Sequence, residues 1–134
     1  MANFAYPSIK TKMLTGQFNW LTNNISVVLV AQGAYTPSTA HQTLLDVPVA
    51  SRVAASAVLT GRTVNVNVVD ADDYLFSSVA GPVIGAAILV ANGTNDATSS
   101  LICYLDTELG LPFTPNTGPL QLSWDNGPNR IFAL

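Results

Sequence analysis

Charged side chains are scarce in this sequence of 134 residues. Only 10% of the residues are Asp, Glu, Lys or Arg, whereas roughly a quarter are charged in an ordinary soluble domain. The basic residues are few and scattered along the chain: Lys10, Lys12, Arg52, Arg62 and Arg130. Because they are too dispersed to neutralise a phosphate backbone, we expect no nucleic-acid partner. The polar surface must be built from neutral Thr, Asn and Ser side chains, which allow copies of the chain to approach one another.

Long apolar runs and cysteines are scarce as well. The longest apolar run, residues 83–91, falls well short of the ~20 residues that a membrane span needs, so we expect no membrane partner. The first residues carry no positive region before a long apolar core, so we expect no secretory targeting. The single cysteine, Cys103, excludes an internal disulfide and lies inside an apolar run, which predicts a buried thiol.

Few residues could carry catalysis. His41 is the only histidine and Glu108 the only glutamate. One histidine cannot form a two-histidine metal site, and the sequence has no Gly-x-Ser-x-Gly turn that could expose a serine nucleophile. We therefore expect no enzyme activity, no catalytic residues and no cofactor, and we assign His41 a structural role.

Three carboxylates lie within four residues at Asp70, Asp72 and Asp73. Calcium prefers oxygen ligands, so one interpretation is a calcium site. The alternative is a tight turn in which the aspartate side chains accept hydrogen bonds from nearby backbone N–H groups. We favour the turn and expect no bound metal, because neither a glycine nor a distal glutamate completes an ion-binding loop here.

The apolar residues predict an all-β chain. Segments of about five to eight apolar residues alternate with clusters of Gly, Pro, Asn and Asp, which is typical of a single antiparallel β-sandwich or barrel-like domain. The predicted strands are residues 25–31, 52–59, 63–68, 74–79, 83–90, 101–105 and 120–124. Strict alternation over residues 63–68 predicts valines inward and asparagines outward. A turn over residues 125–129 predicts that residues 120–124 and 130–134 pair as a closing hairpin, with Ile131 and Phe132 near the core.

Other segments depart from this strand rhythm. Residues 36–45 predict one short helical turn, because hydroxyl caps and Pro37 precede helix-tolerant residues. Residues 92–100 and 107–119 form loops that are long for a sandwich, and we consider both to be contact candidates. The aromatic residues that fall in predicted strands are expected to pack in the core: Tyr74, Phe76, Tyr104, Trp124 and Phe132.

The N-terminal stretch lacks convincing strand alternation. Pro7 interrupts regular pairing, so we expect residues 1–15 to form an N-terminal arm on a domain of residues 16–134. Terminal arms are ordered only where something ties them down, which favours packing on a neighbouring subunit; an edge strand in the chain's own sheet is the alternative. The candidate subunit contacts are apolar residues of the arm and the loops: Phe4, Tyr6, Ile9, Phe18, Trp20 and Phe113.

Short turn and strand signatures follow one another in a specific order along the chain. They are Tyr35-Thr36-Pro37 with His41, Leu45-Asp46-Val47-Pro48, Asp70-Ala71-Asp72-Asp73, Asp106-Thr107 with Gly110-Leu111-Pro112, Thr114-Pro115-Asn116, and Trp124-Asp125-Asn126-Gly127 with Ile131-Phe132-Ala133-Leu134. In this order they resemble small virion-associated proteins of tailed bacteriophages and prophages. The resemblance spans nearly the whole chain and implies a structural part of a virus particle, without a defined chemistry. The stretch Gln17-Phe18-Asn19-Trp20 departs from it, because a polar lead into the first strand is expected there.

Three function classes are compatible with this resemblance. We expect a capsid cement or decoration protein that binds the major capsid protein and stabilises the head shell, because a rigid β scaffold, an extended arm and uncharged surfaces suit that task. Such a protein is made in the host cytoplasm, is located on the capsid exterior of the virion, and is expected to be a homo-oligomer, a homotrimer. The alternatives are a tail or adsorption component, which binds a receptor or another tail protein, and a phage enzyme that acts on host polymers.

Overall fold

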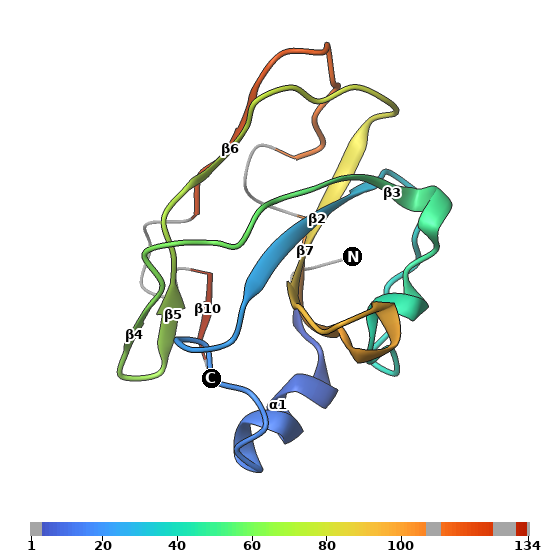
Figure 1. The fold of residues 1–134 in the computed structure, drawn as a ribbon. Helices are drawn as coiled ribbons and strands as arrows, with labels where there is room; N and C mark the ends of the chain where they lie inside the picture. The colour runs from blue at the N-terminus through green and yellow to red at the C-terminus, as the bar shows by residue number, and fades with distance from the viewer. Residues whose placement is uncertain (1–3, 107–110, 125–130, 134) are drawn as a thin grey trace.

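Antiparallel β-strands form most of the regular structure in the computed structural model, which describes residues 4–106, 111–124 and 131–133 (Figure 1). The largest sheet has five strands in the order β1 (Phe4–Ala5), β8 (Ser100–Leu105), β7 (Ile84–Ala91), β2 (Ile25–Ala31) and β3 (Arg52–Ala55). A three-stranded sheet has the order β10 (Phe132–Ala133), β5 (Val68–Asp70) and β4 (Thr63–Asn65), and β6 (Tyr74–Phe76) pairs with β9 (Leu120–Leu122). The chain is therefore mostly β, as predicted, and its described sheets are open, without a closed barrel.

Helices are short in the described part of the chain. The α-helix α1 spans Pro7–Leu14, and three 3-10 helices span Leu44–Asp46, Val49–Ser51 and Asp96–Thr98. None of the described helices is long and apolar enough to cross a bilayer. Within the helical turn predicted for residues 36–45, the structure has a turn closed by the N–H of His41 on the carbonyl of Ser38 and the start of the 3-10 helix Leu44–Asp46, where Thr43 and Asp46 form a reciprocal capping box.

The central strands β2, β7 and β8 are buried on both faces. Along β2, Val27 and Leu29 pack in one apolar cluster, while Val28 and Val30 pack in another on the opposite face. Such a strand needs apolar residues at every position, which is why residues 25–31 read as a continuous apolar run. The core strands predicted over residues 25–31, 83–90 and 101–105 are confirmed within one residue. Cys103 is buried in β8, as predicted, and burial raises the pKa of its thiol.

The larger of the two apolar clusters joins the five-stranded sheet to the two smaller sheets. Val69 of β5, Phe76 of β6, and Leu120 and Leu122 of β9 pack in it together with the inner residues of β2 and β7. Each large apolar side chain that is fully buried stabilises the fold by about 1.5–3 kcal/mol. Tyr74 and Phe76 share one face of β6, as predicted, with their ring centroids 4.8 Å apart.

Residues 4–14 pack against the domain and do not form the predicted arm. β1 pairs with β8, with Phe4 opposite Tyr104, and α1 packs Ile9 into the larger cluster. The side chains of Tyr6 and Ile9 have no exposed surface. Pro7 was expected to interrupt pairing, but proline is favoured in the first turn of a helix, where its missing N–H leaves no hydrogen bond unmade. Residues 4–5 therefore form the edge strand that was the alternative to an arm.

Residues 63–68 form a hairpin and not the predicted single strand. Asn65 of β4 lies opposite Val68 of β5, which leaves Val66 and Asn67 as a two-residue turn. Val66 has a φ of 62° and its side chain is 92% exposed, so the valines do not all point inward. A positive φ is rare for a β-branched residue and costs roughly 1–3 kcal/mol. The sequence concealed this turn because it contains neither glycine nor proline, the residues that usually mark one.

The predicted closing hairpin is also wrong. β9 pairs with β6 and β10 pairs with β5, so the two segments belong to different sheets. The predicted turn over residues 125–129 and the side chain of Phe132 lie outside what the structure describes, whereas Ile131 is buried in the larger cluster as predicted. The strands predicted over residues 52–59 and 74–79 are present as the shorter β3 and β6.

Replacing Val66 with glycine should raise the thermal stability of the isolated domain. Glycine adopts a positive φ without a Cβ clash, so Val66→Gly removes a strain of roughly 1–3 kcal/mol, of which about 0.4–1 kcal/mol is offset by the greater freedom of the unfolded chain. Thermal unfolding followed by circular dichroism measures the midpoint. The matched control, Val64→Gly, lies in strand β4 and should lower it. A lower midpoint for Val66→Gly would contradict the strained turn.

Candidate functional site

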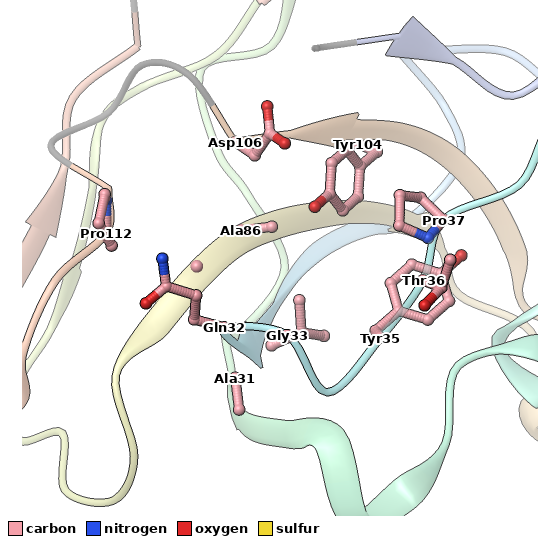
Figure 2. A pocket seen from close by; sticks show the side chains of 12 residues that line it. Ala31, Gln32, Gly33, Tyr35, Thr36, Pro37, Ala86, Tyr104, Asp106 and Pro112 are labelled. Atoms are coloured by element: carbon pink, nitrogen blue, oxygen red, sulfur yellow. The ribbon is translucent and has the colours of Figure 1, made fainter. Parts of the chain in front are cut away.

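A pocket of about 380 Å³ lies where the end of β2, the start of β7 and the end of β8 meet (Figure 2). In this view, Tyr35, Thr36 and Pro37 stand on one side of the pocket and Pro112 stands on the other. Gly85 in β7 sets the spacing of the walls, because a Cβ at this position would lie only 2.7 Å from the Cα of Gln32. The strand and the segment after β2 could not approach so closely with any other residue there.

Tyr35 is held in the pocket wall by a relay of hydrogen bonds. Its hydroxyl lies 2.9 Å from the hydroxyl of Tyr6 and 2.7 Å from Nδ1 of His41. Tyr6 follows β1, whereas Tyr35 and His41 lie after β2, so the relay joins segments that are distant in the sequence. Rings surround it: Phe4 stacks edge-on against Tyr6, and Tyr104 of β8 contacts both Phe4 and Tyr35.

One arrangement of protons lets every group of the relay bond. In it, Nδ1 of His41 accepts a hydrogen bond from the Tyr35 hydroxyl, and the Tyr35 oxygen accepts one from the Tyr6 hydroxyl. Burial, followed by the hydrogen bond to Tyr35, raises the pKa of Tyr6, and burial also raises the pKa of Tyr35. Both hydroxyls therefore stay protonated at neutral pH, so they serve as hydrogen-bonding groups and not as bases.

Two carboxylates lie close to this aromatic group. The backbone N–H groups of Gln42 and Thr43 donate to Asp46 and hold the pKa of that carboxyl below its usual range. Asp106 lies at the pocket itself, beyond the end of β8 (Figure 2). Burial, and then the charge of Asp106 and its hydrogen bond, raises the pKa of Tyr104 to about 12. Asp106 is the only charged residue among the described residues that line the pocket.

The residues predicted to contact other subunits lie mostly inside the domain. Ile9, Phe18 and Trp20 are buried in the larger cluster, and Tyr6 is buried in the smaller one with Phe4 packed against it. Phe113 is half-buried and exchanges two backbone hydrogen bonds with Ile84. The pocket residues were missed because nothing in the sequence spacing of Tyr35, Tyr104 and Asp106 shows that β2 and β8 both lie beside β7.

The acidic segment 70–73 connects both tryptophans to the fold. The indole N–H of Trp20 donates to the backbone carbonyl of Asp70, and that of Trp124 donates to the carbonyl of Asp72. The carboxylate of Asp73 accepts the backbone N–H of Trp124 at 3.0 Å, while Asp72 bonds to Thr60. Within the described residues, no three His, Cys, Asp or Glu side chains come together as a metal site would need. The predicted tight turn is wrong, because residues 71–73 form no turn between β5 and β6, and these hydrogen bonds join the segment to residues that are distant in the sequence.

No protein-family model matches the chain, and no curated protein matches its sequence. The resemblance to phage virion proteins therefore stays a prediction. The site itself offers an acidic pocket with aromatic walls and protonated hydroxyls, an arrangement that is suited to binding.

Removing the Tyr35 hydroxyl should destabilise the domain by about 1–3 kcal/mol, because Tyr35→Phe leaves the buried hydroxyl of Tyr6 without its acceptor. Urea unfolding monitored by tryptophan fluorescence gives the free energy. In the Tyr6→Phe background the same substitution should cost less, since no buried donor is then left unpaired. Strictly additive losses in this double-mutant cycle would show that the two hydroxyls do not interact.

Asp73 should act as a hydrogen-bond acceptor and not as a metal ligand. Asp73→Ala removes the acceptor of the Trp124 N–H and should cost about 1–2 kcal/mol, whereas Asp73→Asn keeps an acceptor oxygen and should be nearly neutral. Chelator and added calcium should leave the melting temperature of the unmodified protein unchanged. A fall on chelation, with Asp73→Asn as damaging as Asp73→Ala, would instead indicate a bound cation.

Proposed function

We propose that this chain is a structural protein of a bacteriophage virion, namely a capsid cement protein. It binds the major capsid protein on the outside of the head shell and stabilises the shell. The observation that carries the proposal is a set of large aliphatic side chains that stand in solvent on a surface poor in charge. Such side chains gain free energy when a partner covers them.

The two most exposed of these side chains belong to elements at one end of the molecule, whereas the next two, Val49 and Leu45, lie in the 3-10 helices Val49–Ser51 and Leu44–Asp46. Val66 is 92% exposed at the β4–β5 turn and Leu14 is 89% exposed at the end of α1. Leu21 and Val64 are also exposed, and Arg62 bonds the start of β4 to the loop of Leu21 through the carbonyls of Leu21 and Asn23. Figure 1 shows α1 and the β4–β5 hairpin toward the same end. We call Leu14, Leu21, Val64 and Val66 the apolar end.

The strained conformation of Val66 supports an assembly role for the apolar end. A β-branched residue at positive φ lowers the stability of its own domain, and its exposed side chain gains nothing from the core in return. Covering Val66 and Leu14 against a coat subunit would gain about 1.5–3 kcal/mol for each side chain, before ordering costs are subtracted. That gain is large enough to offset the strain.

The rest of the fold supplies a rigid support for this contact. We propose that the five-stranded sheet and the two smaller sheets form an irregular β-sandwich, with the larger apolar cluster as its filling. Copies of the chain meet on the shell as a homotrimer, which the low charge permits because little repulsion keeps neighbours apart. Light scattering on the isolated protein measures the state in solution.

Val66→Gly should weaken binding to head shells although it stabilises the domain. Purified shells that lack the protein are mixed with each variant, and retention is measured after sedimentation. We expect at least about tenfold weaker retention, because roughly 1.5 kcal/mol or more of apolar contact is lost. The matched control is Leu75→Ser, which removes an exposed aliphatic side chain on β6, outside the apolar end, and should bind normally.

The outcomes of this experiment are distinct. Lower retention with a higher melting temperature separates assembly from folding and supports the proposal. No retention of the unmodified protein on shells, or equal retention of Val66→Gly, would overturn it.

A further inference from the structure

The pocket beside the tyrosine relay has a definite chemical character. Asp106 brings one negative charge to the pocket. In Figure 2 the side chain of Gln32 lies across the pocket from Asp106, with Ala86 of β7 between them. Tyr35 and Tyr104, whose ring centroids are 6.2 Å apart, line the side of the pocket opposite Pro112. A ligand here meets a carboxylate, an amide and aromatic carbon within one small space.

Two features hold this space open. Gly85 leaves no side chain between β7 and Gln32, where a Cβ would collide with the backbone. The relay from Tyr6 through Tyr35 to His41 fixes the side that carries Tyr35, which keeps that wall from collapsing into the pocket. The volume of about 380 Å³ lies within the range of ligand pockets and is sufficient for one long side chain.

We propose that this pocket binds the guanidinium group of an arginine side chain. Oδ1 of Asp106 has almost no exposed surface, so the other carboxylate oxygen accepts one N–H donor, the amide oxygen of Gln32 accepts another, and the planar group packs against tyrosine carbon. Guanidinium is favoured over ammonium because it is planar, presents several donors in one plane and is more weakly hydrated. The identification of the arginine as one of a coat subunit rests on the proposed function, whereas the pocket's preference does not.

The position of Asp106 supports this assignment. The hydrogen bond with Tyr104 ties the carboxylate to β8, next to the buried aromatic group. A carboxylate held in place loses less freedom when it binds a cation than a mobile one does. In a chain with a net charge of −3 it also attracts a basic group before contact.

The test uses the free protein and two small probes of nearly equal shape. N-acetyl-arginine methylamide is titrated into the ¹⁵N-labelled chain, and N-acetyl-citrulline methylamide, which replaces the charged guanidinium by a neutral urea, is the matched probe. We expect the arginine probe to shift the amide signals of Gln32, Gly33, Gly85 and Ala86, which line the pocket, and the citrulline probe to leave them in place. The lysine analogue should bind more weakly than the arginine probe.

A pair of variants separates the pocket from general charge effects. Asp106→Asn should weaken binding of the arginine probe by about tenfold or more. Asp96→Asn removes one negative charge elsewhere, where Asp96 pairs with Arg52 at 3.0 Å, and should leave binding unchanged. The thermal midpoint of each variant verifies that the fold is intact.

Several results would overturn the inference: equal shifts with the citrulline probe, equal binding of the lysine analogue, normal binding by Asp106→Asn, or no shift with any probe. The shell experiment stands apart from these. If Val66→Gly loses retention while the pocket ignores the arginine probe, the pocket inference fails and the virion proposal does not. If the arginine probe binds but shells do not retain the protein, the virion proposal fails and the pocket inference does not.

Discussion

The burial of β2, β7 and β8 on both faces is the constraint on which the rest of the structure depends. Strands without a solvent face must be apolar along their whole length, and any polar group among them needs a partner, as Ser26 finds in Asn92 at 2.8 Å. Each face then needs its own cover. The two smaller sheets and α1 cover one face, while residues near Tyr6, Tyr35 and Val47 cover the other.

Tyrosine and tryptophan side chains hold the segments that pack on both faces of the large sheet. Tyr and Trp bring large apolar area into a core together with an O–H or N–H that must be bonded there. On one face the two indoles donate to the backbone of segment 70–73, and on the other Tyr6, Tyr35 and His41 bond in series. These hydrogen bonds join parts of the chain that are far apart in sequence. Because they are directional, they fix how the covering segments are placed on the sheet, which non-directional apolar packing alone does not. The pocket borders one of these hydrogen-bonded segments, because Tyr35 lines it.

The sequence predicted the features that depend on local pattern. A continuous apolar run of five to eight residues predicted β2, β7 and β8, and the burial of Cys103 followed from its place in one of them. It failed where the outcome depends on distant partners. Pro7 is compatible both with an interruption of strand pairing and with the start of a helix. The helix forms because it buries Ile9 in the larger apolar cluster. β9 and β10 each find a partner elsewhere, which no local turn signal determines. The pocket needs three strands in register, so it too was beyond a reading of the sequence.

The pocket and the apolar end, the two proposed contacts, are linked by one strand. Leu21 precedes β2 and belongs to the apolar end, while Val30 and Ala31 at the other end of β2 line the pocket. The strand has seven residues, which at about 3.3 Å per residue separates the two by roughly 20 Å. Because β2 is a fully buried interior strand of the large sheet, this spacing is set by a well-packed part of the molecule. A partner surface that matched both contacts would bind the second one as an intramolecular step, and such a step adds affinity without any further contact. In the proposed cement role, two modest contacts at a fixed spacing would be sufficient for firm attachment to a regular lattice, and a lone coat subunit that reached only one of them would be held weakly.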